Sequence, residues 1–375
     1  MTPVPEAGAS VDPLASFDLE SLVSGAARMR AERAALCDST TSAQPVTFAE
    51  FDRRVSALAG FWRDLGLQPG ERILLATGAT ATNVIALFAA LRAGLDAALA
   101  PLHLDAAEMV DFACRCDAAA LAAEAVYGES WPAEDLMGIA SRAPRVRFVC
   151  SLGGGDIDGA VDADPAKLAA STAIIAGATP SASRILTRSP TGEIVHHKQR
   201  TLVAAALDLV TRAHIGMRLP IVTTIAPTTF AGLCAGPVAA LLAGAPLILH
   251  GPFQSAEFST LLRRWSPAHL VAPSALLAAL RGAQLVNSQR LASLILVSRH
   301  PDLASASASA SDDTGETVPI IDLFAIGERA AVPELRGKGR TFLAEPHYIS
   351  LDERNLLAVG RGADGTLEGV GVSSR

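Results

Sequence analysis

The sequence of 375 residues lacks any cluster of basic residues. Its formal net charge at pH 7 is −7, and the charged residues are spread along the chain. Proteins that bind nucleic acids usually gather Lys and Arg in one run or on one face. The charge distribution therefore predicts no nucleic-acid partner.

A long uninterrupted apolar run is also missing. The longest stretch without a charged residue, 219–256, contains five prolines. A helix that crosses a bilayer needs ~20 consecutive apolar residues, and proline interrupts helices. We expect buried strands and a buried helix in this stretch, and no membrane span. Residues 1–20 contain four acidic residues and no basic-then-apolar pattern, so we expect no secretory signal and a cytoplasmic protein.

Cysteines are few and scattered. Of the five, Cys114 and Cys116 are separated by a single residue, which is too close for a zinc-binding pair, and no second pair accompanies them. The pattern predicts a reduced protein with inert thiols and no disulfide framework.

Apolar residues, in contrast, make up half of the chain, with Ala, Leu and Val dominant. A chain of this length and composition can bury more than one core. The segment 47–50 (TFAE) has the form of a capping box, in which Thr47 accepts from an amide and Glu50 reaches back. Helix-like and strand-like segments alternate after it at short intervals. This alternation predicts an α/β fold in which helices cover largely parallel sheets.

The same pattern gives expectations for individual segments. We expect a helix over 83–94, a strand over 73–76, one long helix over 108–124, a strand over 184–189 and a helix from about Lys198 to His214. His196 and His197 are interpreted as the polar start of that last helix.

The predicted domain organisation has four parts. A flexible arm over 1–20 precedes a first α/β lobe over 21–170 and a second α/β lobe over 171–340. Residues 300–317, which are rich in Ser, Ala and Asp, are predicted to form a mobile loop within the second lobe. A short β-rich tail over 341–375 follows.

Three segments in a fixed order resemble the adenylate-forming superfamily, which includes acyl-CoA synthetases, aryl-CoA ligases, luciferases and the adenylation domains of peptide synthetases. The first (65–102) has a Gly-x-x-x-Gly-acid-Arg turn before a strand and a helix. The second is 226–249 and the third is 320–330, IIDLFAIGERA. The resemblance implies the large N-terminal domain of that superfamily, built from two sheet-and-helix lobes.

The resemblance also implies where a nucleotide would bind. The family's phosphate loop, rich in Gly, Ser and Thr, corresponds to Thr187-Arg188-Ser189-Pro190-Thr191-Gly192 here. Backbone amides and glycines let such a loop surround an anion. This loop has one glycine, an amide lost to Pro190 and no loop lysine, so we expect a weak grip on phosphate. Arg188 or Lys198 could pair with phosphate, but a solvated basic face is the alternative interpretation.

Further site residues follow from the other two segments. Phe324 stands where the family has a tyrosine near the nucleotide, and Glu328 stands where it has a carboxylate associated with Mg²⁺. For Glu328 a surface or capping role is the alternative. The segment implied to bind the acid contains Thr228, Thr229, Phe230 and Gly232, with threonines where relatives often carry histidine.

No residue corresponds to the lysine of the family's small C-terminal domain, so no catalytic residue is assigned and that domain is expected to be absent. The sequence therefore predicts a divergent, truncated homologue with little or no adenylation activity, which binds an acyl or aryl acid or acts as a scaffold in a biosynthetic pathway, and which needs no cofactor. The alternative is an active ligase that uses ATP, with AMP as the leaving product, and Mg²⁺. Its partners would be a carrier protein or a separate C-terminal domain supplied in trans. A purely structural module is a third possibility.

Overall fold

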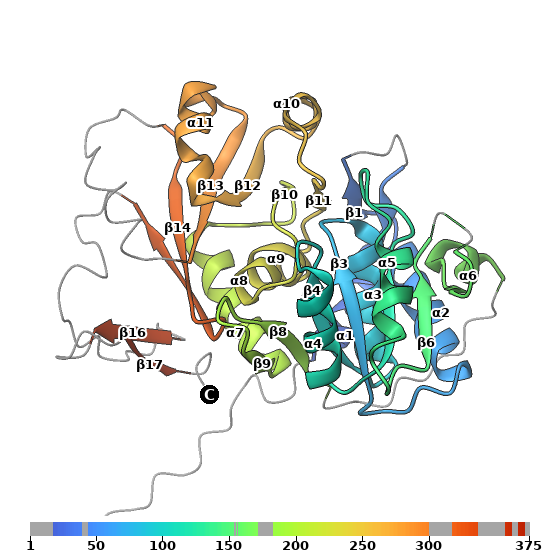
Figure 1. Ribbon diagram of the computed structural model, residues 1–375. Helices are drawn as coiled ribbons and strands as arrows, with labels where there is room; N and C mark the ends of the chain where they lie inside the picture. Colours follow the sequence, from blue (N-terminus) through green and yellow to red (C-terminus); the bar gives the residue numbers. More distant parts are fainter. Residues whose placement is uncertain are drawn as a thin grey trace, which may run out of the picture.

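The structure is a computed structural model, and it describes residues 18–39, 44–153, 155, 157–171, 183–299, 317–336, 357–361 and 367–371. Two large sheets dominate it (Figure 1). The first sheet has the order β7-β6-β5-β3-β4-β8-β9. In the same order its strands are Val161–Asp162, Phe148–Ser151, Ala118–Ala123, Arg72–Thr77, Asp96–Pro101, Ile185–Arg188 and Ile194–His197.

The second sheet has the order β15-β14-β13-β12-β10-β11-β1-β2. In that order its strands are Ala330–Leu335, Ile320–Ile326, Leu291–Ser298, Ala268–Pro273, Ile221–Thr223, Leu247–Leu249, Ala34–Asp38 and Val46–Thr47. Both sheets are parallel in their centres, and the antiparallel pairs lie at their edges: β8 with β9, β14 with β15 and β1 with β2. A separate antiparallel pair, β16 (Leu357–Arg361) with β17 (Leu367–Gly371), agrees with the β-rich tail predicted there.

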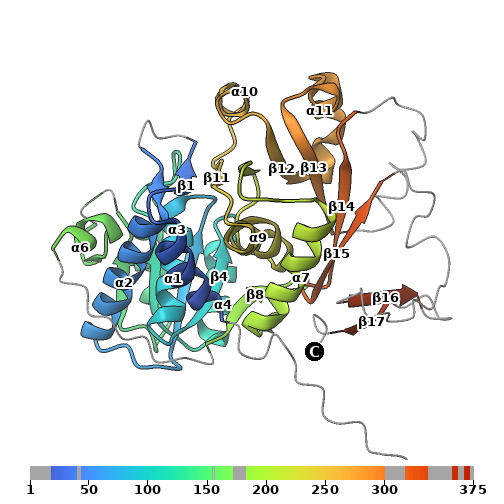
Figure 2. The ribbon, with the colours of Figure 1, turned by 180° about the vertical axis from the view of Figure 1, so that it is seen from behind.

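Helices cover both sheets on both faces (Figures 1 and 2). Those of the first half are α1 (Leu19–Arg30), α2 (Phe48–Asp64), α3 (Ala81–Arg92), α4 (Ala106–Arg115), α5 (Pro132–Ala140) and α6 (Pro165–Ser171). Those of the second half are α7 (Gln199–Arg212), α8 (Phe230–Leu233), α9 (Ala239–Ala243), α10 (Ser255–Arg264) and α11 (Leu277–Gly282), with a π-helical turn, Cys234–Val238, joining α8 to α9.

The two sheets alternate with three layers of helices, which gives five layers in all. The alternation of side chains along each strand explains this arrangement. Successive side chains of a strand point to opposite faces, so Ile73 and Leu75 of β3 join the central core, while Leu74 and Ala76 join an outer core. The central core lies between the sheets and contains α1–α3 and α7–α9. One outer core holds α4 and α5 against the first sheet, and the other holds α10 and α11 against the second. The α/β prediction with two sheet-and-helix lobes is confirmed.

The two sheets exchange strands across the sequence. The strands β1 and β2 come early in the chain but complete the second sheet, where β1 pairs with β11. The strands β8 and β9 lie beyond residue 183 but complete the first sheet, where β8 pairs with β4. The predicted boundary between residues 170 and 171 therefore does not coincide with the division between the sheets.

Several local predictions need correction. The long helix expected over 108–124 ends at Arg115, and Ala118–Ala123 is instead the central strand β5. Because β5 is all alanine and leucine, its sequence fits a helix as well as a strand. The capping box at Thr47 is half confirmed, since the Thr47 hydroxyl accepts from the Glu50 amide, while the Glu50 carboxylate pairs with Arg53 and Arg54.

The arm predicted over 1–20 and the loop predicted over 300–317 lie almost wholly outside the described residues, and α1 already begins at Leu19. Cys37, Cys116, Cys150 and Cys234 are buried free thiols, and burial raises the pKa of Cys116 and Cys150 to about 12. Among the helices described, none combines the length and the apolar character that crossing a bilayer requires.

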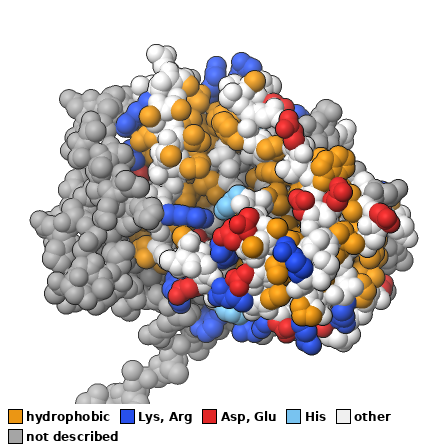
Figure 3. Space-filling view, viewed as in Figure 1, with side chains coloured by type: hydrophobic (Ala, Val, Ile, Leu, Met, Phe, Trp, Pro, Cys, Tyr) orange, Lys and Arg blue, Asp and Glu red, His pale blue; other side chains and the backbone are white. Residues whose placement is uncertain are grey.

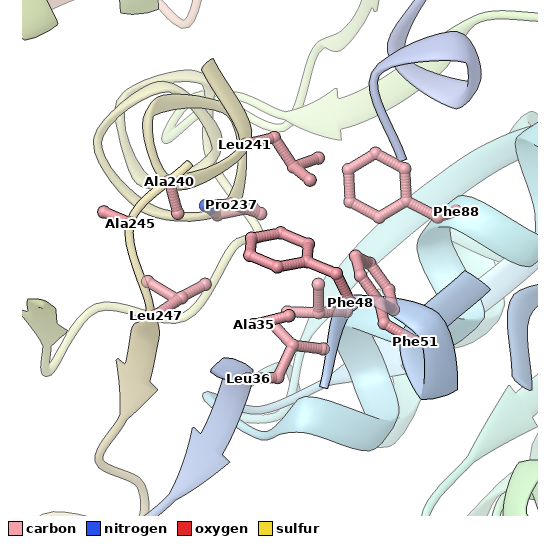
Figure 4. Close-up of a pocket in the computed structure, with 11 residues that line it drawn as sticks. Ala35, Leu36, Phe48, Phe51, Phe88, Pro237, Ala240, Leu241, Ala245 and Leu247 are labelled. Atoms are coloured by element: carbon pink, nitrogen blue, oxygen red, sulfur yellow. The ribbon is translucent and has the colours of Figure 1, made fainter. Parts of the chain in front are cut away.

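Aromatic side chains fill the junction between the two halves of the chain (Figure 4). Phe48, Phe51 and Phe88 meet Pro237 and Leu241 there. The rings of Phe51 and Phe88 are perpendicular, with centroids 5.6 Å apart. The space left between these groups is about 10 Å³, at the lower limit for a single water molecule. This part of the junction is therefore packed core and has no room for an acid.

We predict that Phe88→Ala lowers the free energy of unfolding by about 3–5 kcal/mol, because it removes a fully buried ring and leaves a cavity. Urea unfolding followed by circular dichroism measures this change. Met29→Ala, at a side chain that is 79% exposed, is the control and should change it by less than about 0.5 kcal/mol. Equal effects of the two substitutions would contradict the packing described for the junction.

Candidate functional site

The segment predicted to be the phosphate loop is the turn of a β-hairpin. Strands β8 and β9 pair in antiparallel register from Ile185 opposite His197 to Arg188 opposite Ile194. Residues 189–193 connect them, and Gly192 has the positive φ of 84° that favours glycine. The strand expected over 184–189 and the helix expected from 198 are both confirmed, but a second strand separates them.

Hydrogen bonds close this turn upon itself. The Ser189 amide donates to the Glu193 carbonyl at 2.8 Å, and the Gly192 amide donates to the Ser189 carbonyl at 2.9 Å. The Glu193 amide donates to Ser189 Oγ at 3.0 Å, and the hydroxyls of Ser189 and Thr191 lie 2.9 Å apart. Pro190 has no amide hydrogen. Most of the donors that would surround a phosphate are therefore already used inside the turn.

Helix α4 holds the hairpin from outside. Nη2 of Arg188 lies 3.1 Å from Oε1 of Glu108, and Nη1 of Arg115 donates to the Gly192 carbonyl at 2.9 Å. Glu108 is itself fixed by a capping box with Asp105 at the start of α4. The predicted cation Arg188 thus has a carboxylate partner, while Lys198 is the N-cap residue of α7 and is exposed.

Glu328 lies at the centre of a buried group that we call the Glu328 cluster: Thr187, His197, Phe230 and Glu328. One carboxylate oxygen, Oε2, accepts from the Phe230 amide at 2.7 Å and from the Thr187 hydroxyl at 3.4 Å. The other, Oε1, lies 3.9 Å from the Arg299 guanidinium. Glu328 is only 3% exposed, so the alternative of a surface residue is wrong. The alternative of a capping residue is confirmed, because Phe230 is the first residue of α8.

The turn between β14 and β15 explains how a charged residue enters the core. Gly327 and Glu328 both have positive φ, 54° and 57°, and the Arg329 amide donates to the Ile326 carbonyl. Two such residues in a two-residue turn are typical of a type I′ hairpin. A left-handed conformation costs a residue other than glycine about 1–2 kcal/mol, which the hydrogen bonds of the carboxylate offset. Burial raises the pKa of Glu328 above its usual value, against the lowering effect of the Phe230 amide and Arg299.

His197 is the member of the cluster that sequence reasoning missed. It was interpreted as the start of a helix, but it ends strand β9, where Val195 and His197 point inward and His196 is exposed. Its Nε2 lies 2.8 Å from Thr187 Oγ1. Either atom can be the donor in this contact, depending on the tautomer of the ring. Burial lowers the pKa of His197 to about 4, so the ring is neutral. The two β-branched residues Ile194 and Val195, directly after a Gly turn, are the signal that would have indicated this second strand.

The remaining predicted site residues are buried and largely structural. Thr229 is the N-cap of α8 and accepts from the Gly232 amide at 3.0 Å. A Cβ at Gly232 would lie 2.5 Å from the Ala226 carbonyl oxygen, so only glycine fits. Thr228 is buried beside them, and Phe230 packs on the His197 ring with centroids 5.1 Å apart. Phe324 is a buried residue of β14, opposite Val332.

Comparison with solved structures shows which proteins have this layered fold. The anthranilate CoA ligase AuaEII, bound to anthranoyl-AMP, is 18% identical with a TM-score of 0.65, over 82% of this chain and 59% of its own. A putative long-chain-fatty-acid CoA ligase from Rhodopseudomonas palustris is 14% identical with a TM-score of 0.75, over 96% and 90%. A benzoate CoA ligase from Burkholderia xenovorans is 16% identical with a TM-score of 0.72, over 96% and 72%.

These proteins share the fold of adenylate-forming ligases, and this chain spans less than two thirds of the length of AuaEII. The sequence also matches the model of the family described as AMP-binding enzyme over residues 23–328. The chain therefore belongs to the AMP-binding enzyme family. No curated protein sequence matched it.

Enzymes of this family use ATP and Mg²⁺, and the residues present do not fit a triphosphate with its metal ion. The hairpin turn offers few outward amides, and Arg188 already faces Glu108. Oε2 of Glu328 accepts two hydrogen bonds, and Arg299 near Oε1 disfavours a cation there. Within the described ranges, no three or more His, Cys, Asp or Glu side chains are arranged to hold a metal ion.

We predict that Glu328→Gln becomes more stable relative to the natural protein as pH rises. A carboxyl whose pKa is raised by folding contributes most below its unfolded pKa, and the contribution is lost as pH rises through the folded pKa. Glutamine stays neutral and still offers an oxygen to the Phe230 amide. Urea unfolding between pH 4.5 and 8 measures the difference, with Glu134→Gln on the exposed face of α5 as the control. A difference independent of pH would show that Glu328 is not held as described.

Proposed function

We propose that this chain is a member of the AMP-binding enzyme family that has lost most or all adenylation activity and that binds an acyl or aryl acid, or acts as a scaffold, in a biosynthetic pathway. The acid class is suggested by the similar ligases, whose names refer to anthranilate, benzoate and long-chain fatty acids. These acids share an apolar body and one carboxylate.

The closed hairpin turn is the observation that carries this proposal. Adenylation requires that the protein stabilise the charge that develops on phosphate, and each such interaction typically contributes ~10²–10³ in rate. Here the amides of Ser189, Gly192 and Glu193 are used within the turn, and position 190 has no amide hydrogen. Opening the turn for a nucleotide would break these hydrogen bonds, each worth about 0.5–1.5 kcal/mol net.

A second candidate is an active acid ligase that uses ATP and Mg²⁺ and receives a C-terminal domain or a carrier protein as a partner. One observation favours it: the structure brings Thr187 of the hairpin and Glu328 of a distant turn within 3.4 Å of each other. Both positions belong to the nucleotide site that the resemblance implies. In an active enzyme the carboxylate would have to exchange the Phe230 amide for a metal ion.

We predict that the protein shows no acid-dependent exchange of pyrophosphate into ATP above the background without protein. With 1 mM ATP and Mg²⁺ the melting temperature should rise by less than about 1 °C. A ligand whose dissociation constant exceeds its concentration stabilises the folded protein only slightly. Benzoate, anthranilate and a fatty acid are tested as the acid, each with and without ATP, AMP and CoA.

Glu328→Ala distinguishes the two candidates. If the natural protein catalyses exchange and Glu328→Ala abolishes it, the active-ligase candidate is correct and the proposal fails. Stabilisation by an acid in the absence of nucleotide, unchanged in Glu328→Ala after allowance for its own melting temperature, supports an acid-binding protein.

A further inference from the structure

A groove of about 630 Å³ lies in the outer layer of the first sheet, between helices α4 and α5. Ala76 of β3 contributes to its floor, Met109 of α4 to one wall, and Leu136 and Ile139 of α5 to the other. No residue of the hairpin turn or of the Glu328 cluster lines it. Its volume lies within the range of ~300–1,000 Å³ typical of small-molecule sites. Figure 3 shows hydrophobic side chains reaching the surface on the face where Figure 1 places α4 and α5.

The composition of the sheet contributes to the floor of the groove. The side chains that the central strands direct toward α4 and α5 are mostly alanine, at positions 76, 98, 100 and 123. Of these four, Ala76 lines the groove. Interiors normally pack as densely as organic crystals, and a larger residue at position 76 would fill part of the floor. Leu102 and Leu104, which follow β4, extend the apolar lining.

Among the described residues, the lining carries polar side chains at three positions. Ser130 and Asp135 lie at the start of α5, and Arg142 lies just after its end. Nη2 of Arg142 donates to the carbonyl of Ala106, the first residue of α4, at 3.2 Å, so the guanidinium is anchored across the rim. The formal charges of Asp135 and Arg142 cancel. The lining therefore offers hydrogen-bond donors and acceptors without a net charge.

We propose that this groove binds an uncharged, elongated apolar molecule with a single polar group, such as a fatty alcohol or an acyl ester. The apolar lining contributes through the area it removes from water. A hydroxyl or ester carbonyl finds partners in Ser130, Asp135 or Arg142, whereas a charged group would lose its hydration without a surplus of opposite charge to replace it. The proposal is independent of whether the protein forms adenylates.

Three probes with the same chain and different charge test the proposal: 1-octanol, octanoate and octylammonium, titrated by calorimetry at pH 7. We expect saturable binding of 1-octanol with a dissociation constant on the order of 100 µM. Octanoate and octylammonium should each bind at least about tenfold more weakly, because of the cost of burying an unmatched charge.

Gly138 offers a variant that fills the groove without disturbing the fold. It lines the groove, and a Cβ at this position would meet no atom within 4 Å. Leucine is also favoured over glycine within a helix. Gly138→Leu should therefore fold, melt no lower than the natural protein, and bind 1-octanol at least about tenfold more weakly. Gly60→Leu is the matched control in α2, where a Cβ is equally free of contacts, and should leave binding unchanged.

The outcomes separate clearly. Saturable binding of 1-octanol that is lost in Gly138→Leu and kept in Gly60→Leu supports the proposal. Three results would each overturn it: no saturable binding of 1-octanol, equal binding by Gly138→Leu, or tighter binding of octanoate or octylammonium. This experiment measures the binding of 1-octanol and not pyrophosphate exchange. The result of the binding experiment is therefore independent of the result of the adenylation test.

Discussion

The candidate site depends on one buried carboxylate. Glu328 accepts the first amide of α8 and the hydroxyl of Thr187, and it faces Arg299 at the end of β13. Three parts of the chain that are far apart in sequence therefore meet at one side chain, which a left-handed backbone turns inward. A buried carboxylate left without these partners would be costly, so the positions of the hairpin, of α8 and of the β14–β15 turn constrain one another.

Much of the fold could be predicted from the sequence, because strand and helix periods differ and because Gly and Pro mark the turns. The capping box at Thr47 correctly marked the start of α2. The alanine-rich stretch 118–123 was not, since alanine has no periodicity to show and its strand conformation is imposed by neighbours on both sides. The exchange of strands between the sheets could not be predicted either, because pairing between distant segments produces no local sequence pattern.

The sequence analysis predicted that two residues distant in sequence lie in one site, and their roles there stay predictions. Motif order placed Thr187 and Glu328 in one site, and the structure brings them together. Their hydrogen bonds could not be foreseen, since they depend on the backbone of α8 and on His197. The same hairpin is held by α4, whose other side forms a wall of the groove. This helix therefore contacts both the hairpin turn, which is predicted to correspond to the family's phosphate loop, and the lining of the groove.

The exchange of strands between the sheets has a consequence for the order in which the protein can fold. Strand β1 has its parallel neighbour in β11, about two hundred residues further along the chain. Until β11 has been synthesised, the edge of β1 opposite β2 has no strand to pair with. Contacts of such long sequence separation slow folding and expose chains to aggregation. Neither half of this molecule can complete its sheet alone, because each sheet takes strands from both halves.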